Sequence, residues 1–133
     1  MVKKAVTLNT PTGFPPGMPI GLPFSPGMRA GDFIFTSGQV GSVDDNGAEV
    51  KGIEAQTRQT MENLETILEA ADSSFRDVVK VTVFLVDVND FAKMNDVYRT
   101  YFSEDLPTRS TLVVAALAKP SWLVEIECIA YHP

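Results

Sequence analysis

The stretch from Val78 to Val86 constrains the fold most, because a strand of this composition is apolar on both faces. Apart from Lys80 and Thr82, it contains only Val, Phe and Leu. Successive side chains of a strand point to opposite sides of its sheet. On this alternation one side carries Val79, Val81, Val83 and Leu85, and the other carries Val78, Phe84 and Val86. A sheet containing this strand must therefore be covered on both sides.

Two amphipathic segments can cover one side of such a sheet. The first, from Ile53 to Ala71, has apolar or small residues at helical spacing: Ile53, Thr57, Met61, Leu64, Ile67, Leu68 and Ala71. In the second, Asn89 is the expected N-cap, and the buried stripe is Phe91, Met94, Val97, Tyr98, Tyr101 and Phe102. Because two helices cover only one face, the second apolar face predicts a homo-oligomer.

The remaining strand-like segments complete an α+β pattern. They span Asp32–Gly38, Ser110–Ala118 and Leu123–Tyr131, with a short further strand at Val6 and a turn at Asp45-Asn46-Gly47. Their order predicts a mixed β-sheet with two helices packed on one face. At 133 residues, the chain is expected to be a single domain over residues 1–133.

A segment rich in proline and glycine, from Thr10 to Met28, interrupts this pattern near the N-terminus. Its six prolines exclude a helix or a central strand. Apolar side chains alternate with the prolines, at Phe14, Met18, Ile20, Leu22, Phe24 and Met28. The segment is therefore expected to lie against the body of the protein.

Composition and charge exclude several classes of function. A net charge of −6 without a basic cluster argues against nucleic-acid partners. No apolar run reaches the roughly 20 residues of a spanning helix, so no membrane association is expected and the cytoplasm is the simplest location. The single Cys128 and the single His132 cannot make an intrachain disulfide, a zinc site or a convincing catalytic triad. Cys128 is expected in a buried strand, and His132 at the surface.

Three short segments could carry chemistry. Arg109 follows Pro107-Thr108 at the start of a strand, where a guanidinium could hold a carboxylate bidentately, although position alone favours a surface or ion-paired arginine. Glu125 and Glu127 share one face of an apolar strand, where burial would raise their pKa values, unless the strand is an edge with one solvated face. Ser37 alone fits a hydrogen-bonded serine at a strand end.

The same positions, in this order, carry a resemblance to a known family. Its pieces are Gly21-Leu22-Pro23-Phe24, Phe35-Thr36-Ser37-Gly38-Gln39, Gln56-Thr57-Arg58-Gln59, Val81-Thr82-Val83-Phe84, Asp90-Phe91-Ala92-Lys93-Met94-Asn95, Pro107-Thr108-Arg109-Ser110 and Val124-Glu125-Ile126-Glu127-Cys128-Ile129-Ala130. No single piece is decisive. At this spacing and over nearly the whole chain, together they resemble the RidA/YjgF family.

The resemblance implies a homotrimer whose sheets form a central barrel, with ligand sites between subunits. It also implies hydrolysis of reactive enamines and imines of the 2-aminoacrylate type to 2-keto acids and ammonia, with no cofactor and no metal. In that reading Arg109 holds the substrate carboxylate and Glu125 lies near the attacking water. The pocket would also include Phe24, Ser37, Gly38, Asn95 and Thr111.

Two positions depart from the family's pattern. Phe24 stands where typical active members have a tyrosine, so a hydroxyl is missing and a more apolar pocket wall is expected. Thr111 stands where many members have a cysteine. These departures favour the alternative, a non-catalytic protein that binds small carboxylate ligands in the same cleft. A ribonuclease, also attached to this family, fits the acidic charge and the single terminal histidine poorly.

Overall fold

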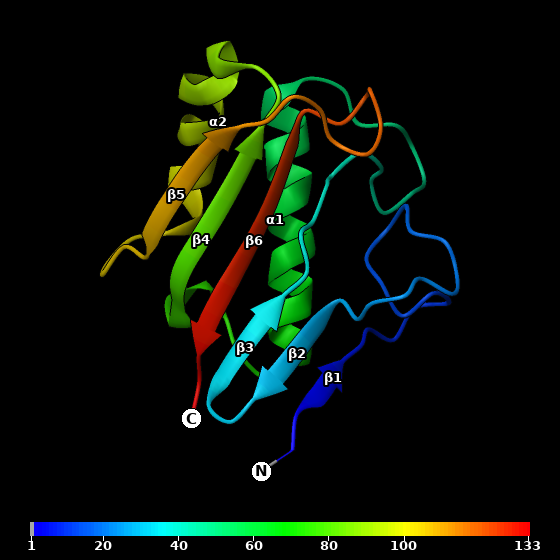
Figure 1. Cartoon of the computed structure of the whole chain (residues 1–133), viewed down its shortest axis with the longest axis vertical. Helices are drawn as coiled ribbons and strands as arrows, with labels where there is room; N and C mark the ends of the chain where they lie inside the picture. The colour runs from blue at the N-terminus through cyan, green and yellow to red at the C-terminus, as the bar shows by residue number, and fades with distance from the viewer. Residues whose placement is uncertain (1) are drawn as a thin grey trace.

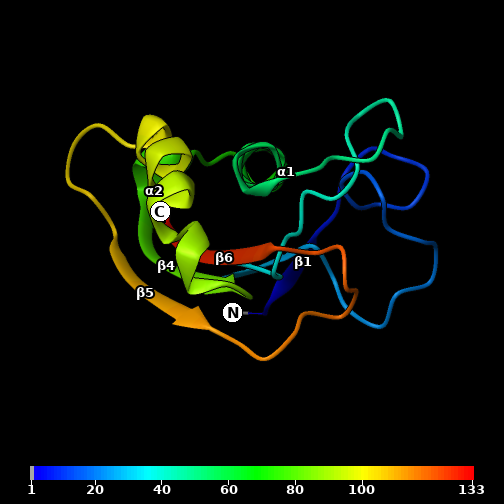
Figure 2. The same ribbon diagram turned by 90° about the horizontal axis from the view of Figure 1, so that it is seen from above.

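The computed structural model describes residues 2–133, which form one mixed sheet with two α-helices on one of its faces (Figures 1 and 2). The strand order is β1-β2-β3-β6-β4-β5, and only β4 and β5 pair in parallel. The strands are β1 (Lys4–Val6), β2 (Gly27–Ala30), β3 (Phe33–Thr36), β4 (Val78–Leu85), β5 (Thr108–Val113) and β6 (Val124–Tyr131). The helices are α1 (Ile53–Ala70) and α2 (Phe91–Tyr98), with single 3-10 turns at Phe75–Asp77, Val88–Asp90 and Arg99–Tyr101. The predicted α+β class is confirmed.

The core lies between α1 and the central strands β4 and β6. The predicted apolar positions of α1, from Ile53 to Ala71, are all buried. They pack on Val81, Val83 and Leu85 of β4 and on the alternating buried positions of β6. Within residues 2–133, no helix combines the length and the apolar character needed to cross a lipid bilayer.

A β-bulge changes the faces of β4 at its start. Val78 pairs with Ala130 and the next pair is Lys80 with Ile129, so Val79 has no partner in the ladder. Val78 is buried in the core, whereas Val79 is 43% exposed. The prediction of strict alternation was wrong here, because the extra residue of a bulge reverses the faces that precede it.

Two strand boundaries also differ from the sequence expectation. Gly27 and Met28 belong to β2, which pairs with β1 and β3, so the irregular segment ends earlier than predicted. Strand β5 covers Thr108–Val113 rather than Ser110–Ala118. It stops there because Val114 N–H donates to the carbonyl of Leu85, the last residue of β4, and beyond that point β4 offers no further partner.

The start of α2 is capped differently from the prediction. The helix begins at Phe91 after the 3-10 turn Val88–Asp90, and Asp87 precedes that turn. The Asp87 carboxylate accepts a hydrogen bond from Asn89 N–H at 2.9 Å. Asn89 is therefore a donor within the cap rather than the N-cap itself, because the chain makes one tight turn before the α-helix starts.

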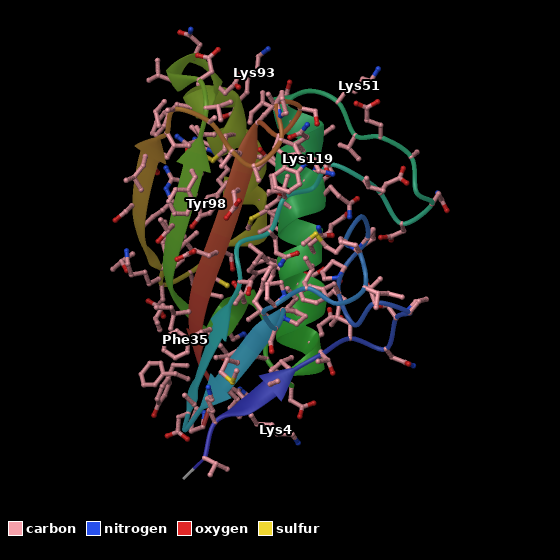
Figure 3. The ribbon with its side chains drawn as sticks, turned by 45° about the vertical axis from the view of Figure 1, so that its right-hand side comes forward. Lys4, Phe35, Lys51, Lys93, Tyr98 and Lys119 are labelled. Carbon is pink, nitrogen blue, oxygen red and sulfur yellow. The ribbon has the colours of Figure 1, made fainter. Side chains whose placement is uncertain are left out.

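The sheet face away from α1 and α2 has no cover within residues 2–133. In Figure 2 both helices lie on one side of the sheet and no element lies on the other. The uncovered face carries Phe33, Phe35, Leu112 and Tyr131, each 42–45% exposed (Phe35 is labelled in Figure 3). This is the second apolar face that the sequence predicted.

The C-terminal end is tied into the fold. His132 N–H donates to the Asp32 carbonyl at 2.7 Å, and the His132 carbonyl accepts from Arg29 at 2.9 Å. The His132 ring nitrogen Nδ1 lies 3.1 Å from the Asp77 carboxylate. His132 lies at the surface as predicted, with its side chain 38% exposed. It is not frayed, because β6 carries the terminus along the sheet to these partners.

Candidate active site

Four of the predicted site residues line one cavity of about 430 Å³. These are Phe24, Ser37, Gly38 and Glu125. The other lining residues are Met18, Leu22, Gln39, Val40, Ala118 and Trp122. The cavity therefore combines one carboxylate and a few polar groups with a largely apolar wall, as small-molecule sites commonly do.

Backbone pairing brings Gly38 and Glu125 together. Gln39 and Ile126 exchange two hydrogen bonds, of 2.8 and 3.0 Å, which place the chain after β3 beside the start of β6. A Cβ atom added to Gly38 would lie 2.8 Å from the Glu125 carboxyl carbon Cδ. The carboxylate thus occupies the space that a side chain at position 38 would need.

The environment of Glu125 favours its protonated form. Burial raises the pKa of the Glu125 carboxyl, and the negative charge of Glu127 raises it further. Strand β6 lies between β3 and β4, so it is not an edge strand. The interpretation of Glu125 and Glu127 as residues of an edge strand is therefore excluded. A carboxyl with a raised pKa in a cavity is suited to accepting a proton and returning it during a reaction.

Ser37 holds the loop that carries Phe24. Its hydroxyl donates to the Ser25 carbonyl at 2.5 Å, and its N–H donates to the Pro26 carbonyl at 2.8 Å. The ring of Phe24 meets the ring of buried Phe14 edge to face, with centroids 5.4 Å apart. The segment rich in proline and glycine is therefore packed against the body, as the sequence predicted.

Arg109 lines a second cavity, of about 400 Å³, together with residues that include Tyr98, Leu106 and Pro107. Its guanidinium carbon lies 4.7 Å from the centre of the Tyr98 ring and 5.8 Å from that of Phe91, so the two rings support it by cation–π contact. Tyr98 is labelled in Figure 3. None of the ion pairs within residues 2–133 includes Arg109. Its charge is therefore open to a carboxylate from outside the chain.

Asn95 and Thr111 lie with Arg109. Asn95 falls between Phe91 and Tyr98 on α2, at helical spacings that place all three on one stripe of the helix. Thr111 is two residues beyond Arg109 on β5 and therefore on the same face of the strand. The structure thus divides the seven predicted residues into a group around Glu125 and a group around Arg109.

The two groups lie on opposite faces of the sheet. Arg109 pairs with Val81, which pairs in turn with Cys128, and both of these partners are buried beneath the helices. Glu125 pairs with Phe84 on the uncovered face. Because directly paired residues point to the same side of a sheet, Arg109 and Glu125 cannot meet within one chain.

Cys128 is not placed to act as a nucleophile. Burial raises the pKa of its thiol to about 12, so the thiol stays protonated at neutral pH. Its N–H donates to the Thr36 hydroxyl at 3.0 Å. The expectation of a buried structural cysteine is confirmed.

Sequence reasoning did not assign Trp122 or Tyr98 to the site. Trp122 follows the Lys119-Pro120-Ser121 breaker, and only the fold brings it to the cavity of Glu125. Tyr98 was assigned to the core stripe of α2, and its second role beneath Arg109 depends on the position of β5. The one available signal was that Trp122 is the chain's single tryptophan.

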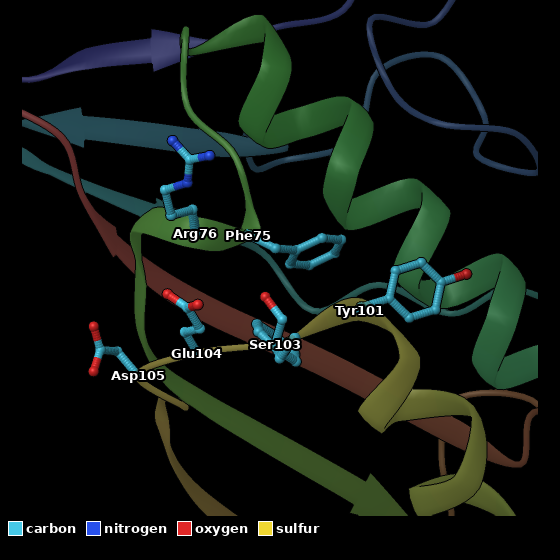
Figure 4. A pocket seen from close by; sticks show the side chains of 7 residues that line it. Phe75, Arg76, Tyr101, Ser103, Glu104 and Asp105 are labelled. Atoms are coloured by element: carbon cyan, nitrogen blue, oxygen red, sulfur yellow. The ribbon is translucent and has the colours of Figure 1, made fainter.

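A further cavity, of about 480 Å³, contains none of the predicted residues (Figure 4). Phe75 and Tyr101 contribute aromatic rings, while Arg76, Glu104 and Asp105 are exposed. In Figure 4 the side chains of Arg76 and Asp105 point away from these rings. The charged groups of this cavity do not converge on one point.

Fold and cavity together define a small α+β protein with a ligand-sized site at one end of its sheet. Residues 19–132 match the family model described as Endoribonuclease L-PSP. A RutC family protein of Pyrococcus horikoshii is 53% identical over 85% of this chain and 89% of its own length. A protein of Mus musculus named 2-iminobutanoate/2-iminopropanoate deaminase is 44% identical over 81% of this chain and 80% of its own length.

A solved structure shares the whole fold. The crystal structure of Escherichia coli TdcF with bound serine superposes with a TM-score of 0.81 at 36% identity, covering 96% of this chain and 98% of TdcF. The family match, the relatives and the shared fold agree with one another. The chain belongs to the RidA/YjgF family.

Proposed function

We propose that this protein is a deaminase that hydrolyses reactive enamine and imine intermediates to 2-keto acids and ammonia. The observation that carries the proposal is a pair of half-sites. One is Glu125, a carboxyl with a raised pKa in the first cavity. The other is Arg109, which packs on the Tyr98 ring at the second cavity and is in no ion pair of residues 2–133. One half supplies a proton acceptor. The other supplies a clamp for a substrate carboxylate.

The relatives support this chemistry. The Mus musculus relative carries the name of an imino-acid deaminase, and TdcF was crystallised with serine, which bears a carboxylate. The departures at Phe24 and Thr111 favoured the alternative of a non-catalytic carboxylate binder, but the names of the relatives do not favour it.

The reaction needs little beyond orientation and proton transfer. In the imine tautomer, water attacks the carbon of the C=N bond, a C–O bond forms, and the π electrons move to nitrogen. Glu125 takes a proton from the water and passes it to the nitrogen, which gives a carbinolamine. Glu125 then takes the proton of the new hydroxyl as the C=O bond forms and passes it to the nitrogen, so the C–N bond breaks and ammonia leaves. The carboxylate held by Arg109 fixes the imine carbon near that water, and such positioning alone can supply several orders of magnitude in rate.

A shared site requires association of chains, and we propose a homotrimer whose sheets form a central barrel. In a cyclic assembly each subunit can present its Arg109 side to the Glu125 side of its neighbour. The same contact would cover the exposed apolar side chains of the sheet. We further propose that residues 1–133 form a single RidA-like domain that acts on small molecules in the cytoplasm and has no nucleic-acid partner.

We expect light scattering at micromolar concentration to give three times the chain mass of 14.5 kDa. The physical reason is the uncovered apolar face, which a monomer would leave in water. A monomer mass under these conditions would contradict both the trimer and the shared site.

We expect the rate to fall on the acid side at a pH above the ordinary pKa of a glutamate. The pKa of Glu125 is raised, so its base form is lost at a higher pH than for a free carboxyl. In Glu127→Gln the repulsion from Glu127 disappears, the pKa of Glu125 falls, and the acid limb of kcat/KM moves to lower pH. Burial is the larger cause of the raised pKa, so in this variant the pKa of Glu125 falls only part of the way to its ordinary value. An acid limb at the same pH in both proteins would show that Glu125 is not the titrating group.

The direct test of the function generates imines in situ from amino acids with an amino-acid oxidase and follows ammonia release in competition with a nucleophilic trap such as semicarbazide. The protein should increase ammonia and decrease trapped imine in proportion to its concentration. Bovine serum albumin at equal concentration controls for non-specific hydrolysis. If no imine in a panel of small, branched and aromatic side chains is hydrolysed faster, the protein is not a deaminase of this class.

A further inference from the structure

The cavity that holds Glu125 has an apolar wall that the reaction itself does not use. Its members are Met18, Leu22, Phe24, Val40, Ala118 and Trp122. We propose that this wall, with Trp122 as its specificity-determining residue, selects imines with large apolar side chains, branched or aromatic, over those with one- or two-carbon side chains. The inference rests on the proposed deaminase function and names its substrate class.

The size and composition of the cavity favour a large apolar group. A volume of about 430 Å³ falls in the range of sites for ligands well above the size of a three-carbon acid. The polar groups Ser37, Gln39 and Glu125 leave most of the lining apolar. A small imine would leave the apolar wall in contact with water, whereas a large side chain would displace that water.

Trp122 is fixed by a buried side-chain amide. Gln56, which is 2% exposed, donates from Nε2 to the Ser121 carbonyl at 2.9 Å and accepts at Oε1 from Leu123 N–H at 2.9 Å. These two bonds hold the residues on either side of Trp122. Lys119 completes the turn by accepting from Trp122 N–H at 3.1 Å, and its ammonium lies 5.7 Å from the indole centre.

The second aromatic residue of the wall is also held in place. Phe24 packs edge to face on Phe14, which is 7% exposed, and the Ser37 hydroxyl holds the neighbouring Ser25 carbonyl. A wall whose members are already ordered binds an apolar group without a further loss of side-chain entropy. The site therefore rewards added methylene groups, each by about tenfold in kcat/KM.

The test compares imines made from phenylalanine and from alanine. We expect wild-type kcat/KM to favour the phenylalanine imine by on the order of 100-fold, and Trp122→Ala to lower this ratio by about tenfold or more. Trp122→Phe keeps an aromatic wall and should retain most of the ratio. Ile20 belongs to the segment that carries Met18 and Leu22, but its side chain is exposed and does not line the cavity. Ile20→Ala should therefore leave both rates unchanged. Thermal unfolding curves check that each variant is folded.

A binding measurement separates failure of this inference from failure of the deaminase function. Calorimetry with phenylpyruvate and pyruvate, the unreactive 2-keto acids, tests the wall without turnover. Tighter binding of phenylpyruvate, lost in Trp122→Ala, supports the wall even if no imine is hydrolysed. Hydrolysis of both imines with a ratio that Trp122→Ala does not change would overturn the wall and leave the deaminase intact. Equal affinities for both acids in the wild type would also overturn it.

Discussion

Arg109→Ala is expected to abolish measurable turnover while the protein remains folded. A charged hydrogen bond to a ligand carboxylate contributes about 2 kcal/mol or more, roughly 30-fold in kcat/KM, and loss of orientation adds to this. The fold should survive, because Arg109 lies on the edge strand β5 and is in no ion pair of residues 2–133. The measurement is kcat/KM on the best imine, with a thermal unfolding curve.

Arg109→Lys is the matched control, since it keeps the charge and loses the two-pronged geometry. We expect it to fall between the wild type and Arg109→Ala. If Arg109→Ala keeps the wild-type kcat/KM on every active substrate, the carboxylate clamp is wrong.

Arg109→Ala can also show whether the site is shared between chains. Glu125→Gln should also be inactive, because an amide cannot accept the proton of water. Arg109→Ala and Glu125→Gln are then unfolded together in equal amounts and refolded as a mixture. In the resulting rings, about one interface in four pairs an intact Arg109 of one chain with an intact Glu125 of its neighbour. Activity should return to about that fraction of the wild type. A mixture that stays inactive, although mixed trimers have formed, would place both groups in one chain.

Gly38→Ala is expected to lower kcat/KM by about 100-fold with little change in stability, because a displacement of about 1 Å at a catalytic group has that cost. The added Cβ would lie 2.8 Å from Cδ of Glu125 and 3.0 Å from its Cγ. A flexible side chain can move away from such a contact, so the carboxylate is displaced and the backbone is not.

Gly41→Ala provides the contrast. Its Cβ would lie 2.6 Å from the Gln56 carbonyl oxygen, which belongs to the backbone of α1 and cannot move away. That variant should lose stability, by about 1–3 kcal/mol as for other overpacked sites. If Gly38→Ala retains full activity, the position of the Glu125 carboxylate does not control the rate.

Local patterns in the sequence predicted the elements whose stability depends on their own periodicity. The helix from Ile53 and the strand from Val78 lie where the apolar spacing placed them. Long-range pairing decided the rest. The bulge at Val79 arises from the register with β6, and the end of β5 is set by the length of β4. The pairing of Gly27 and Met28 depends on β1 and β3, which no local pattern contains.

The sequence supplied candidate residues for the site but not their geometry. The resemblance supplied all seven positions, and the structure places four of them in one cavity. That Arg109 lies on the other face could be read only from the strand register, since residues on different strands have no sequence relation that fixes their faces. Gln56 forms hydrogen bonds to the residues on either side of Trp122, which lie 65 and 67 residues further along the chain. No helical or strand periodicity relates positions so far apart.

The free edge of β5 leaves the isolated chain open to unwanted strand pairing. Within residues 2–133 this strand pairs only with β4, so its other side presents unpaired backbone N–H and C=O groups beside exposed Leu112 and Val113. Such an edge is a template for any extended chain, and natural proteins guard it with charge, proline or a bulge. Between Thr108 and Val113 only Arg109 is charged, and its guanidinium is directed onto Tyr98. A newly made chain is thus exposed to off-pathway aggregation, and assembly into the trimer that we propose would protect it.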